Sequence, residues 1–95
     1  MIDKPTAQKI VLEYLNTRYR VENDELIIVE SLDKEYGWIF FYTSKQYWET
    51  QDFQYAIAGN APIVVEKKDG SLHFLNTVQP VDEMIKDYEK KRQNG

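Results

Sequence analysis

The amino-acid sequence predicts a single α+β domain in the order helix, two strands, long loop, two strands, helix, with a four-stranded, mainly antiparallel sheet. Apolar residues recur every three or four positions before Glu25 and after Pro80, as they do on one face of a helix. Between these points they follow one another directly or alternate, as they do in strands. The 95 residues suit one domain, residues 1–95, with one modest core.

The first helix is expected over Pro5–Arg20. Asp3 or Thr6 can cap its start, and proline is tolerated in a first helical turn. The apolar residues that would share its buried face are Ala7, Ile10, Val11, Tyr14, Leu15 and Tyr19.

Two strands are expected next, over Glu25–Leu32 and Trp38–Tyr42, joined by a polar hairpin loop that ends at Gly37. Large side chains fall on both faces of the second strand, because Trp38 and Phe40 point one way while Ile39 and Phe41 point the other. Both faces of the sheet must therefore be covered.

The expected cover for the second face is the segment 44–61, which is too long for an ordinary hairpin loop. We interpret it as an Ω-like excursion with a helical turn, folded over the sheet. At its end, Gly59 is expected to adopt a positive φ, Asn60 to bond backbone groups, and Pro62 to begin the third strand. The apolar residues of the segment are Tyr47, Trp48, Phe53, Tyr55 and Ile57.

A second hairpin is expected from strands at Ile63–Glu66 and Leu72–Leu75, with Asp69-Gly70 forming a type I′ turn. A closing helix over Pro80–Lys91 follows, with acids in its first turn and bases at its end, as the helix dipole favours. The core is expected to contain Ile10, Leu15, Trp38, Phe40, Phe41, Val64, Phe74 and Ile85.

Composition argues against several classes of site. The chain has no cysteine, one histidine and four widely separated glycines. These features speak against a disulfide framework, a transition-metal site and a phosphate-binding glycine loop. We expect no cofactor and no metal. The lack of cysteine, of a signal peptide and of a long apolar run leads us to expect a cytoplasmic protein that does not enter membranes.

Catalysis is not expected. Ser71 and His73 lie on one face of the predicted fourth strand, but no nucleophile elbow and no third member accompany them. The pair Glu49 and Asp52 would share a face of a helical turn, without any sign of a cleft. A cleft that brings His73 beside a carboxylate would be the feature that favours an enzyme.

Charge and aromatic content point to protein binding. The net charge is −4, and its excess gathers at Glu22, Asp24, Glu25, Glu30, Asp33 and Glu35. An acidic stripe repels nucleic acid and anionic lipid and suits a basic protein partner. The alternative is a solvated face that aids solubility. Tyrosine and tryptophan are enriched in interface hot spots, although the aromatic residues of the long loop have a structural alternative, which is to cover the sheet.

Two groups of residues are candidate partner contacts. One lies near the first hairpin, and the other lies in the long loop. A strand of about six residues, or roughly 20 Å, separates the groups unless the loop folds back along the sheet, so we favour the loop. The hairpin group is Glu30, Asp33, Glu35 and Tyr36, and the loop group is Tyr47, Trp48, Glu49, Asp52 and Phe53.

A family resemblance adds to this interpretation. It rests on Gly37–Tyr42, Trp48–Asp52, Ala58–Val65, Asp69–His73 and Pro80–Glu89. Together these segments resemble the YrhB-domain family, also called the immunity protein 35 family. The resemblance is close from Tyr36 to Glu89, and before that it consists of the order helix then strand.

The resemblance implies a bacterial immunity protein of a polymorphic toxin system. Such a protein binds a cognate toxin domain and occludes its active site, without catalytic residues of its own. One member of the family has been regarded as a small chaperone, so the alternative is a chaperone or stress-linked protein-binding module. Neither the toxin nor the oligomeric state follows from the sequence.

Overall fold

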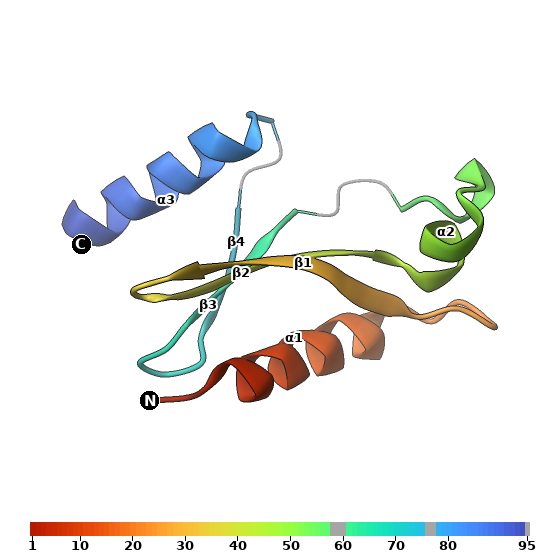
Figure 1. Ribbon diagram of the computed structural model, residues 1–95, viewed down its shortest axis with the longest axis horizontal. Coiled ribbons are helices and arrows are strands. Elements are labelled where there is room, and N and C mark those ends of the chain that lie inside the picture. Colours follow the sequence, from red (N-terminus) through yellow and green to blue (C-terminus); the bar gives the residue numbers. More distant parts are fainter. Residues whose placement is uncertain (58–60, 76–77, 95) are drawn as a thin grey trace.

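The computed structural model describes residues 1–57, 61–75 and 78–94. A four-stranded antiparallel sheet in the order β1-β2-β3-β4 lies between two helices, with α1 on one face and α3 on the other (Figure 1). This architecture confirms the predicted fold class. The elements are α1 (Lys4–Arg18), β1 (Leu26–Lys34), β2 (Gly37–Ser44), α2 (Lys45–Thr50), the 3-10 helix η1 (Phe53–Tyr55), β3 (Ile63–Glu66), β4 (Leu72–Phe74) and α3 (Val81–Asn94).

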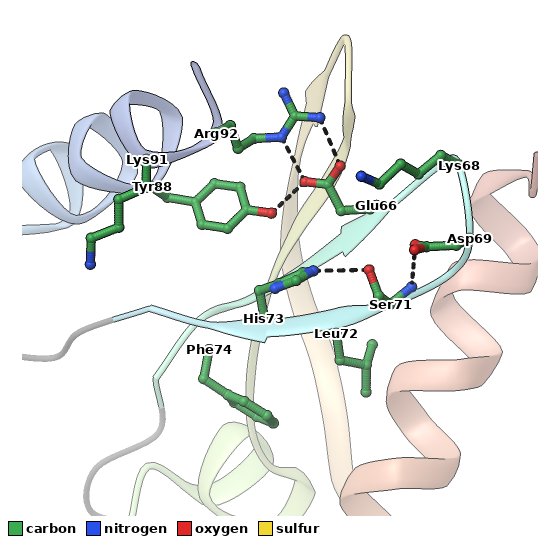
Figure 2. A pocket seen from close by; sticks show the side chains of 10 residues that line it. All are labelled: Glu66, Lys68, Asp69, Ser71, Leu72, His73, Phe74, Tyr88, Lys91 and Arg92. Carbon is green, nitrogen blue, oxygen red and sulfur yellow. Dashed lines mark hydrogen bonds and ion pairs between the residues drawn. The ribbon is translucent and has the colours of Figure 1, made fainter. Parts of the chain in front are cut away.

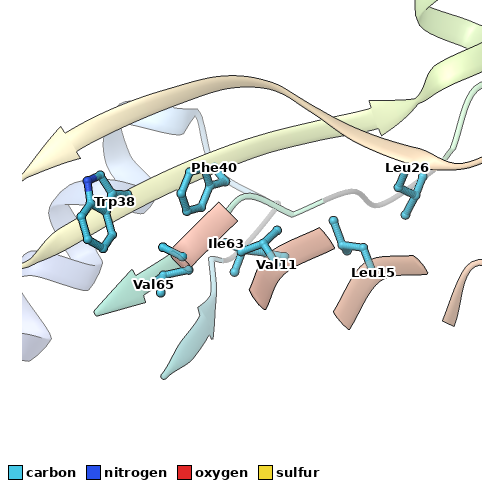
Figure 3. Close-up of a cluster of buried hydrophobic side chains, with 8 residues drawn as sticks. Val11, Leu15, Leu26, Trp38, Phe40, Ile63 and Val65 are labelled. Carbon is cyan, nitrogen blue, oxygen red and sulfur yellow. The ribbon is translucent and has the colours of Figure 1, made fainter. Parts of the chain in front are cut away.

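The first core cluster lies between α1 and the sheet (Figure 3). Asp3 caps α1 by accepting a hydrogen bond from the backbone N–H of Thr6, as one of the two predicted caps. Phe40 and Ile63 are fully buried at the centre of the cluster. Its buried members are Ala7, Val11, Leu15, Leu26, Trp38, Phe40, Ile63 and Val65.

The second face of the sheet is covered by α3, and the prediction that segment 44–61 covers it is wrong. Ile39 and Val64 on this face pack against Leu75, Met84 and Ile85. The consecutive α3 residues Met84 and Ile85 form an apolar ridge, whereas no residue of α2 or η1 is buried. A helix with an apolar stripe buries more apolar surface than a loop whose aromatic residues alternate with polar ones.

The first hairpin is tighter than predicted, because β1 and β2 run on until only Glu35 and Tyr36 remain in the turn. A bulge interrupts the β1–β2 register between Ile28 and Glu30. Gly37 pairs with Glu66 so closely that a Cβ built on it would lie 1.9 Å from the carbonyl oxygen of Val65. Glycine is therefore required there by space.

The second hairpin forms at the predicted strands but not through a type I′ turn. Gly70 has φ +71°, whereas Asp69 has no positive φ. The Gly70 N–H donates to the Glu66 carbonyl, and the Glu66 N–H donates to the Ser71 carbonyl. Because Glu66 and Ser71 are thus paired, the loop consists of the four residues between them. Asp69 stabilises it by accepting from the backbone N–H of Ser71. A type I′ turn needs two residues with positive φ, whereas this longer loop needs only one, which Gly70 supplies.

Five of the eight predicted core residues are buried: Leu15, Trp38, Phe40, Val64 and Ile85. Ile10 and Phe41 are half-buried. The prediction for Phe74 is wrong, because it is 50% exposed on the edge strand β4. The predictions for Gly59 and Asn60 concern positions outside the described residues.

Candidate functional site

The aromatic segment of the long loop forms a projection at one end of the molecule, where α2 and η1 follow β2 (Figure 1). The side chain of Ser44 caps α2 by accepting from the N–H of Tyr47 at 3.1 Å. Gln51, with φ +58°, ends α2, and the Asp52 side chain caps η1 by accepting from the N–H of Gln54. Capping thus fixes two short helices that propensity alone would not stabilise.

Asp24 anchors this projection to the body of the domain. Its carboxylate accepts hydrogen bonds from the hydroxyls of Ser44 and Tyr19 and from the backbone N–H groups of Gln46 and Glu25. Burial alone would raise the pKa of Asp24, but the hydrogen bonds outweigh it, with that from Ser44 the largest, and the pKa is lowered. Asp24 thus joins the end of α1 to the start of α2.

The surface of the projection is aromatic and acidic. Trp48 is 53% exposed and Phe53 is 83% exposed. The Phe53 ring lies 6.2 Å from that of Tyr47, between centroids. Glu49 and Asp52 are exposed beside them. The structure therefore brings together all five candidate residues of the loop, and we name Tyr47, Trp48, Glu49, Asp52 and Phe53 the α2–η1 surface.

The hairpin candidates lie in a different environment. Glu30 is exposed at the β1 bulge and Glu35 is exposed in the turn, while Asp33 pairs with Lys4 at 2.9 Å. The hydroxyl of Tyr36 donates to Glu89 at 2.9 Å. The Tyr36 ring packs 5.7 Å from that of Tyr88 under the guanidinium of Arg92, so this tyrosine fastens α3 to the sheet. Burial and the bond to Glu89 raise the pKa of Tyr36.

The two candidate groups do not meet. The β1–β2 turn lies at the left end of the molecule in Figure 1 and α2 at the right end, along a longest dimension of 41 Å. Neither α2 nor η1 folds back along the sheet to reach the hairpin. The two groups therefore form separate surfaces.

A groove of about 860 Å³ lies between β4 and α3 (Figure 2). Glu66, buried on its floor, accepts two hydrogen bonds of 2.8 Å from Arg92 and one from the hydroxyl of Tyr88. These bonds, with that of Arg92 the largest, lower the pKa of Glu66. Burial and Glu66 together raise the pKa of Tyr88. This network joins α3 to the centre of the sheet.

Ser71 and His73 lie on the rim of the groove, with the Ser71 hydroxyl 2.9 Å from Nε2 of His73. The groove does bring His73 near carboxylates, but Glu66 is bound by Arg92, and Asp69 accepts from the backbone of Ser71. Within the described ranges, no carboxylate hydrogen-bonds the His73 ring. The pair thus lacks the orienting third member that nucleophilic catalysis requires.

Among the described residues, no group of three or more histidine, cysteine or carboxylate side chains is placed to hold a metal ion. None of the helices in that part of the chain is long and apolar enough to cross a membrane.

Sequence reasoning missed the roles of Asp24, Glu66 and Arg92. Asp24 lies among other acidic residues in the sequence, and nothing local distinguishes it from them. The one local signal is Ser44, a typical N-cap residue, which indicates that a helix begins there. Glu66 and Arg92 are 26 positions apart, and no local pattern pairs residues over that distance.

The chain is similar in sequence to known proteins. The profile of the Immunity protein 35 family matches residues 5–90. The chain is 31% identical over 81 residues to the uncharacterized protein YrhB of Escherichia coli (strain K12), covering 83% of this chain and 86% of YrhB. No solved structure matches it. The family match covers most of α1 and of α3 and the whole sheet. This chain therefore belongs to the Immunity protein 35 family.

Proposed function

We propose that this protein binds a cognate toxin domain and occludes its active site, and that the α2–η1 surface faces the toxin. Membership of the Immunity protein 35 family indicates a role in toxin immunity in general. The observation that carries the choice of surface is the exposure of Trp48 and Phe53 on a segment whose start is hydrogen-bonded to Asp24 and whose short helices are capped. Rigid, exposed aromatic residues lose little entropy on binding, which is why they recur as interface anchors.

The core does not require these aromatic side chains. Each face of the sheet is packed against its own helix, and neither core cluster includes Trp48 or Phe53. Exposing two large rings leaves apolar surface in water, at a free-energy cost that folding does not recover. A partner that covers Trp48 and Phe53 recovers it.

Charge supplies the second part of the proposal. Toxins that act on nucleic acids or nucleotides present a basic site to their substrate. Glu49 and Asp52 flank the aromatic residues and would steer the surface towards such a site and block it. Of the hairpin group, Asp33 and Tyr36 are engaged within the chain, so that group takes no part in this proposal.

The test needs a candidate toxin domain, which would be sought first among the products of the neighbouring genes. Calorimetric titration with Trp48→Ala and Phe53→Ala should show affinity reduced at least about tenfold, with unchanged thermal stability. The matched control is Phe74→Ala, which removes another half-exposed ring far from α2 in the sequence. Equal affinity for all three variants would move the interface elsewhere on the protein. No binding by the wild type would reject the proposed partner.

A small chaperone is the second candidate, and it is favoured by the 83% exposure of Phe53, because binders of unfolded chains use exposed apolar side chains. A chaperone would suppress the aggregation of an unrelated heat-denatured enzyme at stoichiometric amounts. An immunity protein would leave that aggregation unchanged and bind one toxin at a fixed ratio.

A further inference from the structure

The outer edge of β4 is an open sheet edge, and its free backbone groups can be identified. Val64 pairs with His73, Glu66 N–H donates to the Ser71 carbonyl, and Leu75 N–H donates to that of Pro62. In an antiparallel ladder, backbone groups alternate between the two neighbours of a strand. The N–H and C=O groups of Leu72 and Phe74 therefore point away from β3, and no described residue pairs with them.

The other edge of the sheet is protected. A bulge interrupts β1 between Ile28 and Glu30, and the exposed acids Glu30 and Asp33 follow it. Bulges and charges are the devices by which proteins prevent strand addition at an edge. The β4 edge has neither a bulge in its register with β3 nor an acidic side chain in Leu72–Phe74.

Basic side chains line the α3 side of this edge. Lys68, His73 and Lys91 border the groove beside β4 (Figure 2). The carboxylate of Glu66 is already neutralised by Arg92. Among the described residues, no carboxylate lies within ion-pair distance of Lys68 or Lys91. Asp69 is the other acidic residue that lines the groove, so Lys68, Lys91 and Arg92 outnumber the two acids there. The α3 side of the edge therefore favours an acidic ligand in a protein whose net charge is −4.

The α1 side of the same edge is apolar. Phe74 points away from His73 in Figure 2. Its ring lies 5.4 Å from that of Tyr14 on α1, and Leu72 packs against the first core cluster. Phe74 keeps 50% of its surface exposed, which leaves room for a further apolar contact.

We propose that the β4 edge binds an extended protein segment in which acidic and apolar side chains alternate, as a fifth strand of the sheet. Side chains of such a strand point alternately to the two faces. Its acids would meet Lys68, His73 and Lys91, its apolar residues would meet Phe74 and Tyr14, and its backbone would bond Leu72 and Phe74. Strand addition of this kind is a general mode of peptide recognition. This surface is distinct from the α2–η1 surface and does not depend on the function proposed for it.

The probe is a fluorescent octapeptide in which valine and glutamate alternate. Binding should be saturable, and the amide signals of Leu72 and Phe74 should shift in nuclear magnetic resonance spectra while their hydrogen exchange slows. The same peptide with alternate backbone nitrogens methylated, so that it cannot pair with a strand, should lose at least about tenfold in affinity. A peptide with lysine in place of glutamate should lose as much.

Protein variants test the charge contacts and the backbone pairing separately. Lys91→Glu should weaken binding about tenfold, whereas Lys90→Glu, which changes an exposed neighbour outside the groove, should not. Phe74→Pro removes one outward N–H and should weaken binding more than Phe74→Ala, which keeps it. If Phe74→Pro does not fold, the methylated peptide makes the same comparison.

Several results would overturn the proposal. The methylated peptide could bind as tightly as the unmethylated one, or the amide shifts could be confined to residues 45–55. A single-stranded oligonucleotide or inorganic phosphate could displace the peptide, or the peptide could fail to bind at millimolar concentration. Because the assay contains no toxin, each of these results leaves the proposed role in immunity untouched.

Discussion

Asp24 and Ser44 are joined by a hydrogen bond of 2.6 Å, from the serine hydroxyl to the carboxylate, and the same serine caps α2. One buried hydroxyl thus fixes both the end of β2 and the direction in which the α2–η1 surface projects. Asp24 adds its own bond to the backbone of Gln46 in the first turn of α2.

Ser44→Ala should therefore lower the free energy of unfolding by about 1–3 kcal/mol, because it removes a cap and one donor to the half-buried carboxylate of Asp24. Amide exchange in Lys45–Thr50 should quicken at the same time. The control is Ser31→Ala in half-buried β1, for which no side-chain hydrogen bond is found among the described residues. Equal effects of the two changes, measured by urea unfolding, would contradict the role of Ser44.

Phe40→Ala should cost about 3–5 kcal/mol of unfolding free energy, because it leaves a cavity at a fully buried position of the first core cluster. Phe53→Ala, at a position 83% exposed, should change stability by no more than about 0.5 kcal/mol. Thermal unfolding of the two variants measures the difference. A melting temperature for Phe40→Ala within a degree of the wild type would refute this assignment of the core.

Gly37→Ala should destabilise the sheet although Gly37 lies at the start of a strand. The added Cβ would meet the carbonyl oxygen of Val65 at 1.9 Å, so β2 and β3 would have to separate locally. We expect a loss of about 1–3 kcal/mol, as for other overpacked sites. Gly70→Ala is a useful comparison, because its nearest neighbour is the side-chain end of Ile10 at 3.4 Å and its cost comes from the positive φ. Wild-type stability of Gly37→Ala would show that the strands are less tightly paired.

Glu66→Gln should lower stability at neutral pH and loosen α3, because Arg92 would lose its carboxylate partner. The pKa of Glu66 is lowered below its ordinary value of 4.5 in the folded protein. Its contribution is therefore present above 4.5 and is lost as the pH falls through the lower folded value. The stability difference between wild type and Glu66→Gln, followed by urea unfolding, should shrink in that acidic window. A difference that stays constant with pH would contradict the network.

The sequence predicted those parts of the fold that depend on local periodicity. The stripe Ala7–Val11–Leu15 identified α1, and the two apolar faces of β2 required a sandwich. Which distant segment covers the second face could not be predicted, because α3 and the long loop both carry apolar residues and their packing is decided by shape. Phe74 was predicted in the core for a related reason. The sequence does not show that β4 is an edge strand, where no neighbouring strand covers the outer side of a side chain.

The candidate site was only partly predictable. The loop residues form one surface, which follows from their proximity in sequence. Their separation from the hairpin group followed from the length of β2. The bonds that hold the surface, from Asp24 to residues up to 22 positions away, depend on the tertiary fold and leave no pattern in the sequence.

The central claim concerns Glu49, Asp52 and Trp48, which we propose supply most of the energy of toxin binding. The test variant is Glu49→Lys with Asp52→Asn, because asparagine keeps the cap of η1 while removing its charge. Glu13→Lys with Asp87→Asn makes the same change in net charge at exposed positions on α1 and α3.

The most direct measurement is the rate of association with the cognate toxin as a function of salt concentration, for the wild type and both variants. The account predicts a wild-type rate that falls steeply with salt, a test variant at least about tenfold slower at low salt that fails to protect cells, and a control variant close to the wild type. A wild-type rate that is flat with salt, together with a test variant that still protects cells, would contradict it.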